Sequence, residues 1–190
     1  MRTGIAVVLF CGMIVPMGYA AQDAAPSAKK VLTPAQAEYQ QKSKEYFTAL
    51  AKLRATANSA YDTEMARAKG ATCPSADTTL SVNECLSGEI TVTQTNYVTF
   101  VSALRCMLSL PLPALAADKV VKGNVAHSEA AKFDHLQTVW TSFAKEQCRV
   151  AVDQYRGGTI MPSVGAECEL RQMRARLTEL DTVYDGPLHR

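Results

Sequence analysis

The stretch that decides the fold is TPAQAEYQQKSKEYFTALAKLRATANSAYDTEMARAKG, residues 33–70. Thr33 can cap a helix, Pro34 suits its first position and Gly70 ends it. Apolar residues recur between these ends at helical spacing, at Tyr39, Phe47, Leu50, Ala57, Tyr61 and Met65. A helix this long either lies along the domain or pairs with a second copy. We favour burial in the chain's own core, because surface helices depend on packing.

The composition and the residue spacing of the segment 80–110 favour different secondary structures. Its many Thr and Val residues favour a strand on propensity. Its larger apolar residues nevertheless recur at helical spacing, at Leu86, Ile90, Tyr97, Val101, Leu104 and Leu108. We therefore expect a helix, which Pro111 and Pro113 end.

Two more helices are expected after a loop through Gly123-Asn124. One begins at Ser128 and ends at Gly157-Gly158, and the other runs to Tyr184. The chain is thus predicted to be all-α, a small disulfide-stapled bundle of about four helices with a long N-terminal helix. The expected parts are a signal peptide at 1–20, a flexible leader at 21–32, the long helix at 33–70, the stapled domain at 71–184 and a tail at 185–190.

The first twenty residues have the pattern of a secretory signal peptide. Arg2 precedes an apolar run that is too short for a membrane span, and small residues lead to a cleavage position after Ala20. We therefore expect a periplasmic or secreted protein with no stable membrane insertion. The whole chain has 20 Lys and Arg against 18 Asp and Glu, so no strong charge attracts nucleic acid.

Five of the six cysteines remain after removal of Cys11 with the signal peptide. Cys73 pairs with Cys85 and Cys148 with Cys168 in the arrangement that we expect, since each pair closes a short local loop in an oxidising compartment. Cys106 lies among apolar neighbours and is expected to be a buried free thiol. The spacings match no zinc motif, so neither a metal nor a cofactor is predicted.

Catalytic patterns are absent from the sequence. His135 follows Asp134 directly, and neighbouring helix positions diverge by about 100°, so the two side chains do not form an aligned base and orienting acid. No serine nucleophile motif and no phosphate-binding loop occur. We therefore predict a protein that is not an enzyme.

Aromatic and basic residues of the last two helices have ordinary structural interpretations. Trp140 and Phe143 continue an apolar stripe and are expected in the core rather than at a binding surface. Arg171 and Arg174 are expected on a solvated face. Arg176 is turned away from Arg174 and is expected to point inward to an acid.

The most suggestive surface is the turn Arg156-Gly157-Gly158-Thr159-Ile160, which continues into Met161-Pro162. The expected Cys148–Cys168 bridge holds its flanks, so little conformational entropy remains to be lost on binding. An inhibitor loop is built in this way. An ordinary stapled turn is built in the same way, so both interpretations stay open.

Several motifs together resemble the LprI-like lysozyme-inhibitor family over about residues 73–180. They are Cys73, SVNECL at 81–86, HLQTVWTSFAKEQC at 135–148, GGTIMP at 157–162 and CELRQMRARLTEL at 168–180. The resemblance implies structural roles for Trp140, Phe143, Arg176 and Leu180, and bridges among the same four cysteines. Where the family usually has Arg-Asp, this chain has Ala144-Lys145, and a family Thr is Met173.

The resemblance implies an exported binding protein whose partner is lysozyme, with inhibition by occlusion of the cleft. The alternative is a structural or adaptor protein of the cell envelope that associates through the helix at 33–70. An enzyme acting on peptidoglycan is the third and weakest interpretation, because the sequence offers no arrangement of nucleophile, base or metal ligands that would suit catalysis.

Overall fold

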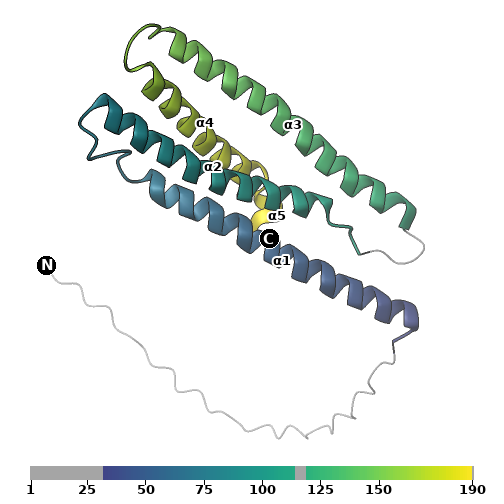
Figure 1. Cartoon of the computed structure of the whole chain (residues 1–190). Helices are drawn as coiled ribbons and strands as arrows, with labels where there is room; N and C mark the ends of the chain where they lie inside the picture. Colours follow the sequence, from purple (N-terminus) through teal and green to yellow (C-terminus); the bar gives the residue numbers. More distant parts are fainter. Residues whose placement is uncertain (1–31, 114–118, 190) are drawn as a thin grey trace, which may run out of the picture. The chain divides into compact units, whose positions relative to one another are not determined.

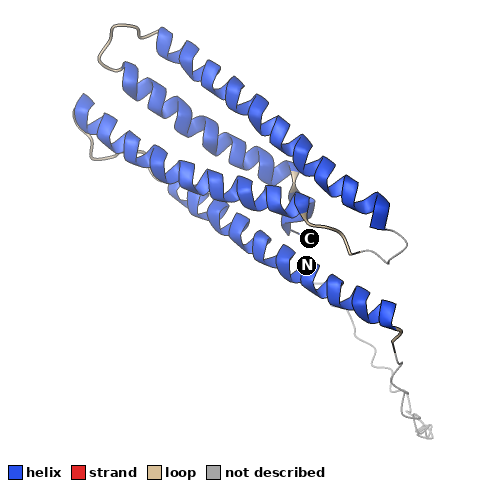
Figure 2. Ribbon diagram, turned by 45° about the vertical axis from the view of Figure 1, so that its right-hand side comes forward, coloured by secondary structure: helices blue, strands red, loops and turns tan. Residues whose placement is uncertain are grey.

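The computed structural model describes residues 32–113 and 119–189, so the predicted signal peptide and the leader up to residue 31 lie outside the described residues. The helices are α1 (Pro34–Ala68), α2 (Thr79–Ser109), α3 (Lys119–Asp153), α4 (Met161–Val183) and the short α5 (Asp185–His189). The described ranges contain no strand, as Figure 2 shows. The prediction of an all-α, disulfide-stapled bundle is confirmed.

The four long helices run side by side, and successive helices point in opposite directions (Figures 1 and 2). Helix α2 packs against α1, α3 and α4, and α4 also packs against α3. Helices α1 and α3 lie on opposite sides of the bundle (Figure 1). The α1–α2 and α3–α4 connections lie at the same end. This end carries both disulfides, Cys73–Cys85 and Cys148–Cys168.

Helix α1 begins and ends at the predicted signals. The Thr33 side chain accepts from the Gln36 backbone N–H, and the Gln36 side chain accepts from the Thr33 N–H, which together form a capping box. Leu50, Ala57 and Ala60 are buried in the common core, and Leu53, Tyr61 and Met65 pack around it. The apolar stripe of α1 is therefore covered within the chain from Leu50 onward, whereas Tyr39 and Phe47 at its start are exposed.

Helix α2 forms despite its strand-like composition because its threonine hydroxyls find hydrogen-bond acceptors within the helix and its apolar side chains are buried. The hydroxyls of Thr91, Thr95 and Thr99 each donate to the carbonyl four residues earlier, at 2.8–2.9 Å. Phe100 and Leu104, on the opposite side of the helix, are fully buried. Burying each of them contributes about 1.5–3 kcal/mol, more than the differences in intrinsic propensity that a few residues can add.

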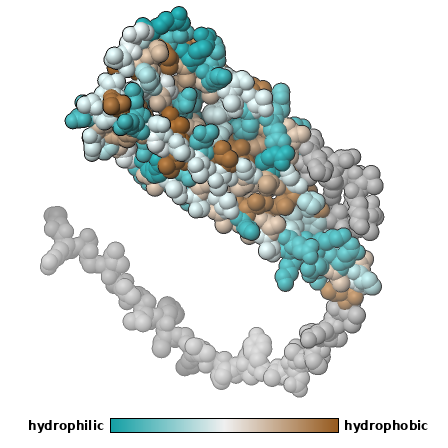
Figure 3. Space-filling view, in the orientation of Figure 1, coloured by the Kyte–Doolittle hydropathy of each residue, from teal (hydrophilic) through white to brown (hydrophobic). Residues whose placement is uncertain are grey.

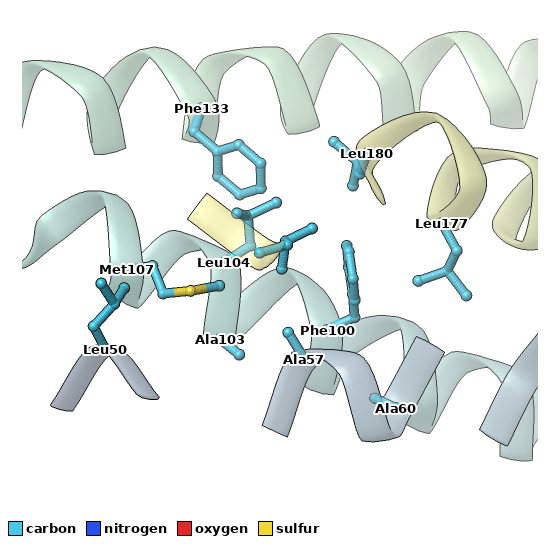
Figure 4. Close-up of a cluster of buried hydrophobic side chains, with 11 residues drawn as sticks. Leu50, Ala57, Ala60, Phe100, Ala103, Leu104, Met107, Phe133, Leu177 and Leu180 are labelled. Carbon is cyan, nitrogen blue, oxygen red and sulfur yellow. The ribbon is translucent and has the colours of Figure 1, made fainter. Parts of the chain in front are cut away.

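The core joins all five helices (Figure 4). Phe100 and Leu104 of α2 lie beside Phe133 of α3, with Leu177 and Leu180 of α4 next to them. Ala57 and Ala60 let α1 approach closely from below in this view. Leu188 of α5 completes the cluster and is almost fully buried.

Three sequence-based expectations about the helix boundaries, the tail and Cys106 are wrong. Helix α3 begins at Lys119 rather than Ser128, so Gly123-Asn124 lies within a helix and not in a loop. The expected tail forms α5, because burial of Leu188 outweighs the turn preference of Gly186-Pro187. Cys106 is exposed rather than buried, since the core side of α2 is taken by its neighbours Ala103, Leu104 and Met107.

Candidate functional site

The predicted binding turn lies at the disulfide-stapled end of the bundle, between α3 and α4. Arg156, Gly157, Gly158, Thr159 and Ile160 are all exposed. Cys148 and Cys168 are both buried and join the two helices that flank the turn. Gly157 has φ +83°, a left-handed conformation that a side chain would strain. The turn is therefore a presented and conformationally restricted surface.

Arg156 is the basic residue of this turn, and its side chain is 77% exposed. Its Nη2 donates to Oδ1 of Asp153 at 2.8 Å. Arg149 also donates to Asp153, at 3.0 Å, and contacts Glu146. The hydrogen bond from Arg156 holds the pKa of Asp153 below its usual value. An exposed pair of this kind contributes little stability, so Arg156 can exchange its partner at low cost.

The α1–α2 connection forms the other half of this end. The Ser163 hydroxyl of α4 donates to the Asn83 side-chain oxygen of α2 at 2.6 Å. A groove of about 380 Å³ lies between Thr78–Val82 and Ile160–Val164. Cys73 has φ 58°, and its disulfide to Cys85 holds the connection against the start of α2. Two connections distant in sequence thus make one surface.

Apolar side chains are exposed at the same end. Leu80 of α2, Tyr155 of the turn and Ile160 beside α4 are each more than two-fifths exposed. Hydrophobic residues also reach the surface at several places on the face shown in Figure 3. An apolar surface beside an exposed arginine is a common composition for a protein-binding patch.

The residues assigned structural roles divide into two groups. Leu180 is buried, and Arg176 is 8% exposed, with its guanidinium 5.5 Å from the Trp140 ring centroid. The Tyr97 ring lies 5.5 Å from Trp140, and burial raises the pKa of Tyr97 to about 12. Phe143 is 61% exposed, so its expected place in the core is wrong. Its α3 neighbour Ala144 takes the inward position instead.

The inward orientation of Arg176 is as expected, but its surroundings differ. Nη1 of Arg176 pairs with Glu179 on its own helix at 2.8 Å, and its guanidinium also reaches the side-chain oxygen of Gln137 at 3.4 Å. Ala144 is buried and Lys145 is exposed, so the departure from the family pattern puts a lysine on the surface beside Trp140.

A buried polar network was not predicted from the sequence. The Glu64 carboxylate is fully buried and accepts from Thr93 at 2.7 Å, Asn96 at 2.9 Å and Arg174 at 2.8 Å. Arg67 and Arg174 also reach Glu89, at 2.7 and 3.4 Å. Arg174 is only 16% exposed, so its expected solvated position is wrong. One feature of the sequence could have indicated this network: Glu64 lies at helical spacing from Ala57 and Ala60, on the buried face of α1.

The pKa of Glu64 is lowered from 4.5 by this network. Burial raises the pKa, but hydrogen bonds from Thr93, Asn96 and Arg174 and the charge of Arg67 together outweigh it. The group is thus a stably ionised structural carboxylate. Within residues 32–113 and 119–189, no three His, Cys, Asp or Glu side chains converge in a way that suits a metal ion.

These features define a disulfide-stapled helical-bundle protein with an exposed, restrained surface at one end. No helix in the described ranges is both long and apolar enough to cross a membrane. The chain belongs to the LprI family: the family model described as "Lysozyme inhibitor LprI" matches residues 70–180. The match confirms the resemblance drawn from the motifs, and it suggests a lysozyme-inhibitor role rather than an enzymatic one.

The family match covers the stapled end and most of the bundle, from the α1–α2 connection into α4. Together with the disulfides it suggests an extracellular or periplasmic protein. No curated protein and no solved structure is significantly similar to this chain.

Proposed function

We propose that this protein inhibits a lysozyme by placing its stapled end over the substrate cleft. Family membership supports the partner class. The observation that carries the mode of inhibition is the turn of residues 156–160, which is exposed throughout and held by the Cys148–Cys168 bridge. We further propose that residues 1–20 direct export and are removed, so that the mature protein meets lysozyme outside the cytoplasm.

Arg156 is the side chain that we assign to the cleft. Lysozymes cleave glycosides with two carboxyl groups, and a guanidinium can bind a carboxylate through paired hydrogen bonds. The only partner of Arg156 among the described residues is Asp153, whose side chain is 37% exposed. Transfer of Arg156 to a less hydrated cleft carboxylate therefore replaces a weak pair with a stronger one.

The stapled turn reduces the entropy that binding would cost. Gly157 already holds the left-handed conformation, and the Gly158 N–H donates to the Tyr155 carbonyl at 2.9 Å within the turn. The exposed side chains of Leu80, Tyr155 and Ile160 supply apolar area beside Arg156. Each 100 Å² of apolar surface buried there is worth about 2.5 kcal/mol before the costs of association.

The test compares Arg156→Ala with Arg105→Ala in a cell-wall clearing assay with a titrated c-type lysozyme. Arg105 is a matched control, since it also donates to an aspartate, Asp134, at 2.8 Å and its side chain is half exposed. We expect the inhibitor concentration for half-maximal effect to rise about tenfold or more in Arg156→Ala, because a charged interface contact is lost. Arg105→Ala should leave it unchanged.

Equal potency of the Arg156→Ala variant and the unaltered protein would remove this side chain from the mechanism. Undiminished clearing at large excess of the unaltered protein would reject lysozyme as the partner. The alternative, an envelope adaptor that associates through α1, would then gain weight, since Phe47 of that helix is exposed.

A further inference from the structure

The groove at the stapled end has an apolar floor and two acidic walls. Ala76 and Val82 line it from the α1–α2 side, and Ile160 and Val164 line it from the α4 side. Asp77 lies on one wall and Glu167 on the other. We propose that this groove holds a lysine side chain of the bound lysozyme, which makes it a second half of the interface beside Arg156. The inference rests on the proposed function.

Both carboxylates are available for a partner. Asp77 and Glu167 are exposed, and neither has an ion pair or a side-chain hydrogen bond within the described part of the chain. Arg171 lies one helical turn after Glu167 and lines a second groove with it, beside Met65 and Leu170, but no ion pair joins the two side chains. The two acids on opposite walls therefore have no ion-pair partner. Basic residues at this end, such as Arg149 and Arg156, already pair with other acids.

The charge of the groove stays negative when the neighbouring helix ends are counted. The first turns of α2 and α4 lie beside it and bring about half a positive charge each. The two carboxylates that line the groove bring two negative charges, so its own lining keeps a net charge of about −1. A cation is thus the complementary occupant.

The shape of the site favours lysine. A long aliphatic stem can lie along Val82, Ile160 and Val164, while a compact ammonium with three donors can reach acids on both walls. A planar guanidinium is better matched to both oxygens of one carboxylate. A divalent metal is a poorer occupant, because the described residues hold no group of three such ligands.

The groove is also formed before a partner arrives. Each wall is held by its own disulfide, Cys73–Cys85 or Cys148–Cys168, and the Ser163–Asn83 hydrogen bond joins the two walls. Binding therefore has little backbone to order. Ile160 belongs both to the predicted binding turn and to the groove floor, so a lysozyme surface that meets Arg156 lies close enough to reach Asp77 and Glu167.

The test is a double-mutant cycle in which one change is made on each partner. The affinity of the unaltered protein and of D77N/E167Q is measured by calorimetry against native lysozyme and against lysozyme with acetylated lysines. Guanidinated lysozyme, whose lysines keep their positive charge, serves as the control for chemical modification. D62N/E45Q serves as the control for net charge, because both of its acids lie on α1 away from the groove and are exposed.

We expect D77N/E167Q to bind native lysozyme about tenfold or more weakly, while D62N/E45Q binds nearly as well as the unaltered protein. Acetylation should weaken binding of the unaltered protein by a similar factor and have little further effect on D77N/E167Q. Guanidination should leave the difference between the two proteins in place. The thermal midpoint of D77N/E167Q should fall only slightly, because neither acid has an ion pair or a side-chain hydrogen bond to lose and only weak interactions with the helix ends disappear.

Additive losses from acetylation and from D77N/E167Q would overturn this inference and leave the Arg156 mechanism standing. Absence of any binding by the unaltered protein would overturn the proposed function and the groove assignment with it. A change in sedimentation of D77N/E167Q without a change in lysozyme affinity would show that the groove holds a second copy of the chain, and would also overturn the assignment.

Discussion

Glu64 connects three helices through one carboxylate. It accepts from Thr93 and Asn96 of α2 and from Arg174 of α4, while it lies on α1. A buried charge is tolerated when hydrogen bonds replace the lost water, and here they are supplied from every side that packs on it. Removal of one partner leaves the others unsatisfied, so the cost is larger than that of an ordinary surface ion pair.

We expect Glu64→Gln to lower the free energy of unfolding by about 2–4 kcal/mol at pH 7, because Arg174 would keep a buried charge with only a distant partner. Glu89→Gln is the matched control in the same network. Its side chain is 30% exposed, so we expect a loss below about 1 kcal/mol. Urea denaturation of both variants measures the difference, and equal losses would contradict the burial argument.

The same network makes stability depend on pH in a defined direction. The folded pKa of Glu64 lies below 4.5, whereas the unfolded chain has an ordinary carboxyl. The network therefore contributes its full stability above about pH 4.5 and loses it as the pH falls toward the folded pKa. The free energy of unfolding, measured at several pH values between 7 and 3, should fall more steeply with decreasing pH for the unaltered protein than for Glu64→Gln.

At the scale of the elements, the start signal of α1 was accurate, but the start expected for α3 at Ser128 and two turn signals were not. Thr33-Pro34 begins α1, and the spacing of apolar residues correctly assigned α2 as a helix. Gly123-Asn124 and Gly186-Pro187 are local turn signals, and both lie in helices. Local preferences of about 1 kcal/mol are outweighed when packing can stabilise a helix, as it does at Leu188.

Helix α5 is short, yet we expect it to contribute to folding. Leu188→Ala should lower the free energy of unfolding by about 2–5 kcal/mol, because a nearly fully buried leucine leaves a cavity in the common core. Val183→Ala, whose side chain is exposed at the end of α4, should change it by less than about 0.5 kcal/mol. Chemical denaturation distinguishes the two variants. An unchanged free energy of unfolding in Leu188→Ala would contradict the packing of α5 and support the free tail that the sequence predicted.

At the scale of the whole molecule, the covalent restraints and the packing are unevenly placed. Both disulfides lie at the end with the α1–α2 and α3–α4 connections. The pairing was predictable from the spacing of the cysteines, because each bridge closes a local helical hairpin. The groove between the hairpins was not predictable, since it depends on contacts between residues about 80 positions apart, such as Asn83 and Ser163.

Removal of either bridge should weaken the fold without erasing it. We expect Cys73→Ser/Cys85→Ser and Cys148→Ser/Cys168→Ser each to lose about 3 kcal/mol of stability, because the loops closed are 12 and 20 residues long. Circular dichroism should still report a helical protein, since the core of all five helices remains. Cys106→Ser is the control; it is exposed and unpaired, and its substitution should leave the urea midpoint unchanged. A comparable loss of stability in Cys106→Ser would show that the loss in the other two variants does not come from removal of a disulfide.

The family match and the folding unit have different boundaries. The matched span begins after α1 and ends before α5, yet Leu50 and Ala57 of α1 and Leu188 of α5 belong to the common core. A recombinant fragment trimmed to the recognised homology region would expose Phe100 and Leu104 to water and aggregate. Fragments for crystallisation, display or library work should therefore extend from Leu32 to His189.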